Sequence, residues 1–204
     1  DRIVPLEDEE ISKLALRSFK KQGMNIKTSK AVKAIEVTSN GATVTFTDVG
    51  DEAKEESVSG EKVLVAIGVA PRCDGLFADS LNIELEHGFI LTDAKTATEP
   101  TYQTSVSGIY AIGDIIGPPL LAHVASEEAV TCIERMNSHH TLGVDYNAIP
   151  GCTYTNPQIA SIGKTEQQLL EDGIDYVAGV YSLKSHGKAI AVGATEGVVK
   201  LLAS

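Results

Sequence analysis

The residues best suited to chemistry stand at Gly113-Asp114 and just after them. Asp114 follows a short apolar run, Ile109–Ile112, which is long enough for one buried strand. Gly113 lets the backbone turn sharply, and a carboxylate at the carboxyl end of a strand can accept hydrogen bonds from ligand hydroxyls. Soon afterwards Leu121-Ala122-His123 opens a helix, whose first N–H groups can donate to an anion or an electron-rich ring. The pattern predicts a site for a long polar ligand.

The stretch Gly108–Asp114 resembles the second flavin-binding signature of the pyridine nucleotide–disulfide oxidoreductases. Its continuation, Leu120–Glu128, is similar to the dihydrolipoamide dehydrogenase branch of that family. The resemblance extends over nearly the whole chain. The alternative for the signature alone is a strand-turn-helix whose aspartate only caps a helix.

The resemblance implies a role for these residues in binding FAD. Asp114 would hold a ribityl hydroxyl of the cofactor. The helix start would place N–H groups near the pyrimidine edge of the flavin, where its positive end stabilises negative charge. The residues that form this helix start are Leu120, Leu121, Ala122 and His123.

The resemblance also implies a contact with NAD at Gly68. Its backbone would approach the nicotinamide cofactor, because a side chain there would block the approach. The family often has two arginines where this chain has Val69 and Ala70, which weakens an inference specific to NAD. The alternative is a plain glycine at the end of a strand.

By resemblance, the complete enzyme moves electrons from dihydrolipoamide to a cysteine pair and through FAD to NAD. Neither a G-x-G-x-x-G fingerprint nor a C-x-x-x-x-C pair occurs here, and we expect the family's catalytic His-Glu pair beyond the end of this sequence. We therefore expect a fragment without catalytic or metal-binding residues of its own, inactive when isolated. The alternatives are another FAD- and NAD(P)-dependent reductase of the family, or a non-catalytic module for dimerisation or interaction.

The amino-acid composition limits the classes of binding partner and the cellular compartments that we expect for this protein. A net charge of −11 argues against nucleic acid and against anionic membrane surfaces, and no apolar run is long enough to span a membrane. The sequence shows no signal peptide, and its three cysteines match no zinc pattern and predict free thiols. We expect a protein of the bacterial cytoplasm or mitochondrial matrix. The resemblance implies a homodimer that serves lipoyl-bearing subunits of 2-oxoacid dehydrogenase or glycine cleavage complexes.

The first part of the chain predicts a helix, a hairpin and a strand. Helical spacing of apolar residues indicates a helix over 8–22 that buries Ile11, Leu14, Ala15 and Phe19. The dipeptide Asn40-Gly41 between β-rich runs predicts a hairpin over 31–47. We expect an exposed loop over 48–60 and a buried parallel strand over 62–67.

The later elements follow from the same signals. We expect a turn at Gly88, an extended surface loop over 92–103, and a helix over 121–137. From Ile149 onward, β runs are predicted at 150–157, 159–163, 176–183, 189–194 and 198–202, with a helix that Thr165 starts and Gly173 ends. The buried side of the helix over 121–137 is predicted to comprise Val124, Ala125, Ala129, Ile133 and Met136.

These elements give an α/β fold class. Residues 1–72 are expected to form the end of a Rossmann-like NAD-binding domain. Residues 73–147 would form a central segment that contacts FAD, and residues 148–204 the start of an α+β dimerisation domain. The β runs after Ile149 need a partner surface that the rest of the chain does not obviously supply.

Overall fold

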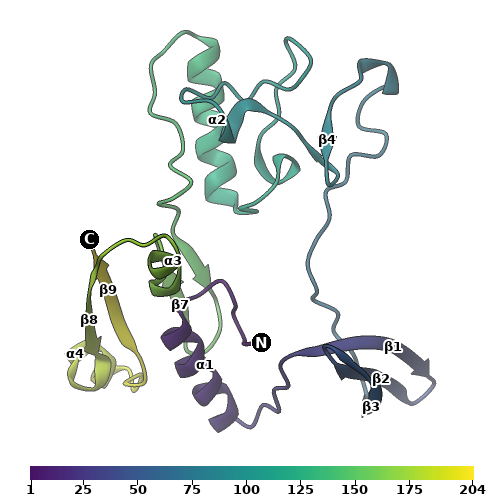
Figure 1. Ribbon diagram of the computed structural model, residues 1–204, viewed down its shortest axis with the longest axis vertical. Helices are drawn as coiled ribbons and strands as arrows, with labels where there is room; N and C mark the ends of the chain where they lie inside the picture. The colour runs from purple at the N-terminus through teal and green to yellow at the C-terminus, as the bar shows by residue number, and fades with distance from the viewer. The chain divides into compact units, whose positions relative to one another are not determined.

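The computed structural model describes residues 1–204, and its mixed helices and strands confirm the α/β class (Figure 1). The chain divides into two units. One combines residues 1–65 with residues 150–204, and the other comprises residues 66–149. The expected three-part division at residues 72 and 147 stays a prediction. None of the helices is both long and apolar enough to cross a membrane.

The first unit begins with the helix α1, Glu9–Lys21, as the sequence predicts. Its N-cap is Asp8, whose carboxylate accepts a hydrogen bond from the Glu10 N–H. Ala15 and Phe19 are buried and pack with Ile159, a residue from the far end of the chain. Because Ser12 and Ser18 are also buried, the covered face of α1 is rotated slightly from the expected one.

A three-stranded antiparallel sheet follows, with the strand order β1-β2-β3. The hairpin of β1, Lys30–Thr38, and β2, Gly41–Asp48, confirms the signal at Asn40-Gly41. The expected loop over 48–60 is wrong, because β3, Asp51–Gly60, pairs with β2. Ion pairs from Lys27 and Lys30 to Glu56 offset the acidic character that suggested a loop.

The expected buried strand over 62–67 is also wrong. These residues adopt no regular structure, and Leu64 and Ile67 are 90% and 92% exposed. A parallel strand needs neighbours to receive its hydrogen bonds, and none of the sheets in this structure includes the segment. The apolar run therefore has the composition of a buried strand, but no other strand in this structure pairs with it.

The C-terminal part of the first unit contains two antiparallel pairs of strands. β6, Gly151–Thr153, pairs with β7, Ile159–Ser161, and β8, Val177–Ser182, pairs with β9, Val198–Ala203. Between the pairs lies the helix α3, Glu166–Glu171, which a capping box at Thr165 starts. Between β8 and β9 lie the turn η4, Leu183–Ser185, and the helix α4, Gly187–Ala191.

The helix α4 corrects the expected strand over 189–194. The segment Lys188-Ala189-Ile190-Ala191 contains only one β-branched residue, and alanine has the strongest helix propensity. Ala189 is buried, and Gly193 with φ of +70° permits the turn that follows the helix. A short, continuous apolar run did not by itself separate a helix from a strand here.

An ion cluster around the buried ammonium of Lys200 connects the two segments of the first unit. The Lys200 ammonium lies 2.9 Å from the Asp8 carboxylate, 2.5 Å from Glu166 and 3.4 Å from Glu10. The Lys200 side chain is 6% exposed. Burial alone would raise the pKa of Asp8, but hydrogen bonds from Lys200 and from the Glu166 and Glu10 amides together lower it. The cluster fixes the start of α1 against α3 and β9.

The second unit is built around the helix α2, Ala122–Met136. Before it come the turn η1, Asp79–Leu81, the short strands β4, Leu85–Glu86, and β5, Phe89–Ile90, and the turn η2, Asp93–Lys95. Next is the turn η3, Gly113–Ile116. The expected turn at Gly88 is confirmed between β4 and β5. The buried cluster of this unit contains Ala94, Tyr102, Ile116 and Cys132.

Residues 92–103 form the expected surface loop only in part: residues 95–99 are exposed, but Asp93 folds the segment back on itself. Its carboxylate accepts hydrogen bonds from the Thr101 N–H at 2.9 Å, the Thr101 hydroxyl at 2.7 Å and the Tyr102 N–H at 2.6 Å. As a result Tyr102 is fully buried. The polar composition of the segment therefore reflects an internal hydrogen-bond network as well as exposure to solvent.

Candidate functional site

The segment that carries Asp114 forms a sharp turn rather than the end of a full strand. The expected strand over 109–112 is reduced to one bridge, in which Tyr110 pairs with Gln103. The Thr104 N–H donates to the Ile109 carbonyl at 2.9 Å, and the Ala111 N–H to the Tyr102 carbonyl at 3.0 Å. The segment has a neighbour on one side only and belongs to none of the sheets, so a full strand does not form.

Asp114 itself lies in η3 and is exposed. Gly113 precedes it with φ of +74°, a backbone conformation that favours glycine. A Cβ atom at Gly113 would lie 3.2 Å from the Ala125 Cβ, so η3 and α2 approach closely. Ile116, at the other end of η3, is buried in the cluster with Tyr102. The turn is thus fixed at both ends while its carboxylate faces solvent.

The beginning of α2 is the second part of the site. Leu121 is the N-cap in an extended conformation, and it makes no side-chain cap hydrogen bond. An uncapped first turn can offer N–H groups, such as that of Ala122, to a ligand. Leu120 and Leu121 are partly buried, whereas Ala122 and His123 are exposed. Asp114 and these expected residues therefore belong to two neighbouring parts of one unit, since η3 contacts α2 directly.

Glu128 joins the two parts of the site, a role that the sequence reasoning missed. Its side chain, on α2, is almost completely buried. One carboxylate oxygen accepts the Gly113 N–H at 2.6 Å, and the other accepts the Tyr146 hydroxyl at 2.7 Å. Burial, and then donation to Glu128, raise the pKa of the Tyr146 phenol, so it remains a donor.

The residues that α2 buries are partly different from those that the sequence predicted. Val124 is buried as expected, but Ile133 and Met136 are 57% and 45% exposed. Glu128 and Thr131 are buried instead. Glu128 lies four residues after Val124 and four before Cys132, both buried. An acid at that spacing on an apolar helix face was the sequence signal for an internal carboxylate.

Gly68 is not brought into this arrangement. It lies in an irregular, exposed segment with φ of +125°, and a Cβ atom placed there would meet nothing within 4 Å. The positive φ favours glycine, but the structure provides no close approach that requires it. Its contact with NAD stays a prediction.

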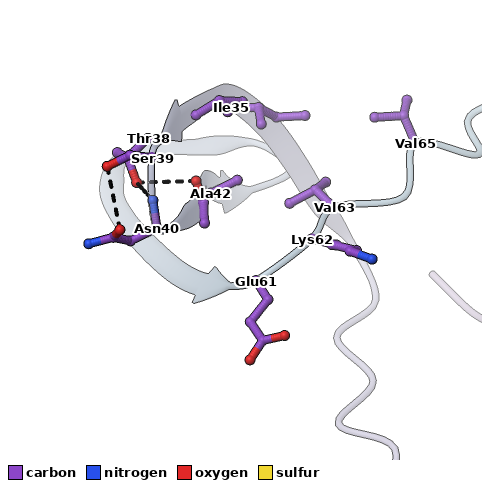
Figure 2. Close-up of a pocket in the computed structure, with 11 residues that line it drawn as sticks. Ile35, Thr38, Ser39, Asn40, Ala42, Glu61, Lys62, Val63 and Val65 are labelled. Carbon is purple, nitrogen blue, oxygen red and sulfur yellow. Dashed lines mark hydrogen bonds between the residues drawn. The ribbon is translucent and has the colours of Figure 1, made fainter.

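The hollow beside the first hairpin and the three cysteines give less support for a functional site. Figure 2 shows a hollow beside the β1–β2 turn, whose lining mixes polar residues of that turn with apolar residues such as Val63 and Val65. Its charged residues, Glu61 and Lys62, follow β3 on an irregular segment. The three cysteines are free thiols. No group of three or more histidine, cysteine, aspartate and glutamate side chains is arranged to hold a metal ion.

Comparison with protein families gives two matches. Residues 1–129 match the family described as pyridine nucleotide-disulphide oxidoreductase. Residues 149–204 match the dimerisation domain of the same group. The second match covers β6 through β9, the part for which the sequence predicted a dimerisation segment.

Similar curated proteins cover the whole chain. The chain is 36% identical over 204 residues to a dihydrolipoyl dehydrogenase from Rhizobium etli, and 37% identical over 202 residues to the mitochondrial one from Pisum sativum. Each alignment covers 98% of this chain but only 40% and 39% of the relatives. The chain therefore spans about two-fifths of their length.

Solved structures share the fold. The crystal structure of LpdA from Mycobacterium tuberculosis matches 99% of this chain, with a TM-score of 0.85 and 23% identity. The HOCl-induced flavoprotein disulfide reductase RclA from Escherichia coli, in a Cu(II) complex, matches 100% with the same TM-score and 20% identity. This chain covers 42% and 44% of those chains.

Proposed function

Since this chain belongs to the pyridine nucleotide-disulphide oxidoreductase family, we propose that the complete protein is a dihydrolipoamide dehydrogenase. In this proposal it oxidises dihydrolipoamide with NAD, through FAD and a redox disulfide. The names of the relatives from Rhizobium etli and Pisum sativum support the substrate. The substrate, the activity and the partners belong to the complete protein, because this chain spans about two-fifths of the relatives.

The observation that carries the proposal is the Asp114 turn placed beside the beginning of α2. Asp114 would accept a hydrogen bond from a ribityl hydroxyl of FAD, and its exposure leaves it able to do so. The residues Leu120–His123 would present the helix start to the flavin pyrimidine edge, and the N-cap residue Leu121 makes no side-chain cap hydrogen bond there. Both features suit a cofactor that has hydroxyls and an electron-rich ring. Bound FAD would supply the carrier that takes electrons from thiols and gives them to NAD.

The test of the flavin assignment is Asp114→Ala in the complete protein. Losing a charge-assisted hydrogen bond costs about 1.5–3 kcal/mol, which weakens FAD affinity roughly ten- to a hundredfold. Asp74→Ala is the matched control, since Asp74 is exposed in the same unit and lies outside the proposed site. Flavin affinity is measured by titrating the apoprotein and following flavin fluorescence. Unchanged affinity in Asp114→Ala counts against the assignment.

The substrate is tested separately. The complete protein should reduce NAD when dihydrolipoamide is supplied, whereas the isolated 204-residue chain should not. Gly68→Ala in the complete protein tests the contact proposed for Gly68, because the added side chain should weaken the binding of NAD if the nicotinamide approaches that backbone. Turnover with a different disulfide substrate, and none with dihydrolipoamide, would favour another reductase of the family.

The proposed partners follow from the dimerisation domain and from the relatives. We propose a homodimer formed through the region from Ile149 onward, which supplies oxidised lipoyl groups to 2-oxoacid dehydrogenase or glycine cleavage complexes. Exposed apolar side chains on β8 and β9, including Val177, Val180, Tyr181 and Leu201, are available to a partner surface. A bacterial cytoplasm or mitochondrial matrix fits the bacterial and mitochondrial relatives. Sedimentation of the complete protein as a monomer at micromolar concentration would contradict the dimer.

A further inference from the structure

We propose that Glu128 is a positioning residue of the flavin site: its buried carboxylate holds the Asp114 turn against α2 and so sets the affinity for FAD. The inference rests on the proposed function. It concerns a residue that acts through the Gly113 N–H rather than through a contact of its own with the cofactor.

The geometry of Glu128 fits this role because both of its oxygens are used inside the unit. The Gly113 N–H donates to Oε2 at 2.6 Å, and the Tyr146 hydroxyl donates to Oε1 at 2.7 Å. The residue is 2% exposed. A carboxylate this deeply buried is costly unless hydrogen bonds replace water, so these two donors stabilise the charge.

The position of these bonds in the chain explains how they act on the site. Gly113 immediately precedes Asp114, so anchoring its N–H fixes the point from which the Asp114 carboxylate extends. Glu128 lies on the same helix whose first turn is proposed to face the flavin. A bond from α2 to Gly113 therefore fixes Asp114 relative to that first turn. Hydrogen bonds to a charged acceptor are stronger than neutral ones, which suits a contact that sets a distance.

A double-mutant cycle in the complete protein tests the proposal. Its four forms are the unaltered protein, Asp114→Ala, Glu128→Ala and the double variant, and FAD affinity is measured for each. We expect Glu128→Ala to weaken FAD binding about tenfold when Asp114 is present, and less than about twofold when Asp114 has been replaced, because residues that act through one another are not additive. Glu127→Ala is the matched control: it removes the same charge from an exposed neighbour on the same helix and should leave the affinity unchanged.

A conservative variant separates positioning from folding. In Glu128→Gln the side-chain oxygen can still accept the Gly113 N–H, while its amide can donate to the Tyr146 oxygen. We expect it to keep FAD affinity within about threefold and to fold even if Glu128→Ala does not. If Glu128→Ala fails to fold, Glu128→Gln takes its place in the cycle. The smaller loss of FAD affinity in Glu128→Gln should then disappear in the Asp114→Ala background.

The outcomes distinguish this inference from the proposed function. Unchanged FAD affinity in Asp114→Ala overturns both. A loss in Asp114→Ala, combined with the same loss from the Glu128 variant in both backgrounds, overturns the inference alone, because a purely structural residue acts independently of Asp114. A Glu128→Ala protein that folds and binds FAD as tightly as Glu127→Ala also overturns it.

Discussion

Replacing Gly113 with alanine measures how tightly η3 is packed on α2. The new Cβ would lie 3.2 Å from the Ala125 Cβ, closer than the ~3.5–4.0 Å optimum between carbon atoms. It would also sit on a residue with φ of +74°, where a left-handed conformation costs an L-residue about 1–2 kcal/mol. Overpacking adds about 1–3 kcal/mol, so the total should be about 2–5 kcal/mol.

Gly108 provides the matched control because it shares the conformation but not the contact. Its φ is +80°, and a Cβ atom placed there would meet nothing within 4 Å. Gly108→Ala should therefore cost only the conformational part, about 1–2 kcal/mol. The part of the Gly113→Ala effect that disappears when Ala125 is replaced by glycine then isolates the contact with Ala125.

The assay is hydrogen exchange of the peptide that contains Gly117, in the complete protein. The Gly117 N–H donates to the Asp114 carbonyl at 3.2 Å, so its exchange reports the free energy of opening the turn. Gly113→Ala should accelerate this exchange more than Gly108→Ala does. In an Ala125→Gly background, which removes the opposing Ala125 Cβ, the loss in the free energy of opening caused by Gly113→Ala should be about 1 kcal/mol smaller. Equal effects of the two glycine variants, or no dependence on Ala125, would refute the packing argument.

Three further perturbations test other parts of the structure. Lys200→Met leaves the largely buried Asp8 carboxylate without its ammonium partner, and should destabilise the docking of α1 by about 3 kcal/mol, seen as faster hydrogen exchange in α1. Asp93→Ala removes the acceptor for three hydrogen bonds and should cost about 3 kcal/mol, seen as faster proteolysis of residues 92–103. The hydrogen bond from Lys27 leads the causes that lower the pKa of Glu56 from 4.5 to about 2. The resulting stability is therefore present above pH 4.5 and is lost as pH falls toward 2. An NMR titration should find this value and should find it raised in Lys27→Ala; a pKa that does not change would contradict the ion pair.

Elements with strong local signals could be predicted from the sequence. The helix α1 has a capping aspartate, acids in its first turn and lysines in its last, all of which act within one element. The β1–β2 hairpin depends on Asn40-Gly41, whose backbone preferences fix the turn without tertiary contacts. The same holds for the α3 capping box at Thr165.

Elements that depend on distant neighbours could not be predicted. The run over 62–67 has the composition of a central strand, yet a strand forms only where other strands receive it. The polar and acidic composition over 48–60 predicts a loop, but lysines elsewhere in the chain pair with Glu56. Helix α4 was missed because a run of five residues has too few positions to distinguish the two periods.

The candidate site likewise contains local features that could be predicted from the sequence and a long-range contact that could not. The sequence indicated Asp114 and the helix start, because a glycine turn and a helix beginning are local features. It did not indicate that Glu128 would receive the Gly113 N–H, since that bond spans 15 residues and depends on how η3 packs on α2. The apolar spacing on either side of Glu128 was a usable signal, because an acid there must find internal donors.

The first unit consists of two separate segments of the chain, 1–65 and 150–204, and this affects how it can fold during synthesis on the ribosome. Its ion cluster joins Asp8 to Lys200, which are 192 residues apart. Helix α1 is translated well before Ile159 and Lys200, with which it packs and pairs, and closing so long a loop is slow compared with local folding. Residues 66–149, in contrast, form a continuous unit that can finish folding before translation reaches Lys200. The nascent chain therefore has to keep the apolar face around Phe19 from associating with other surfaces while the intervening unit assembles.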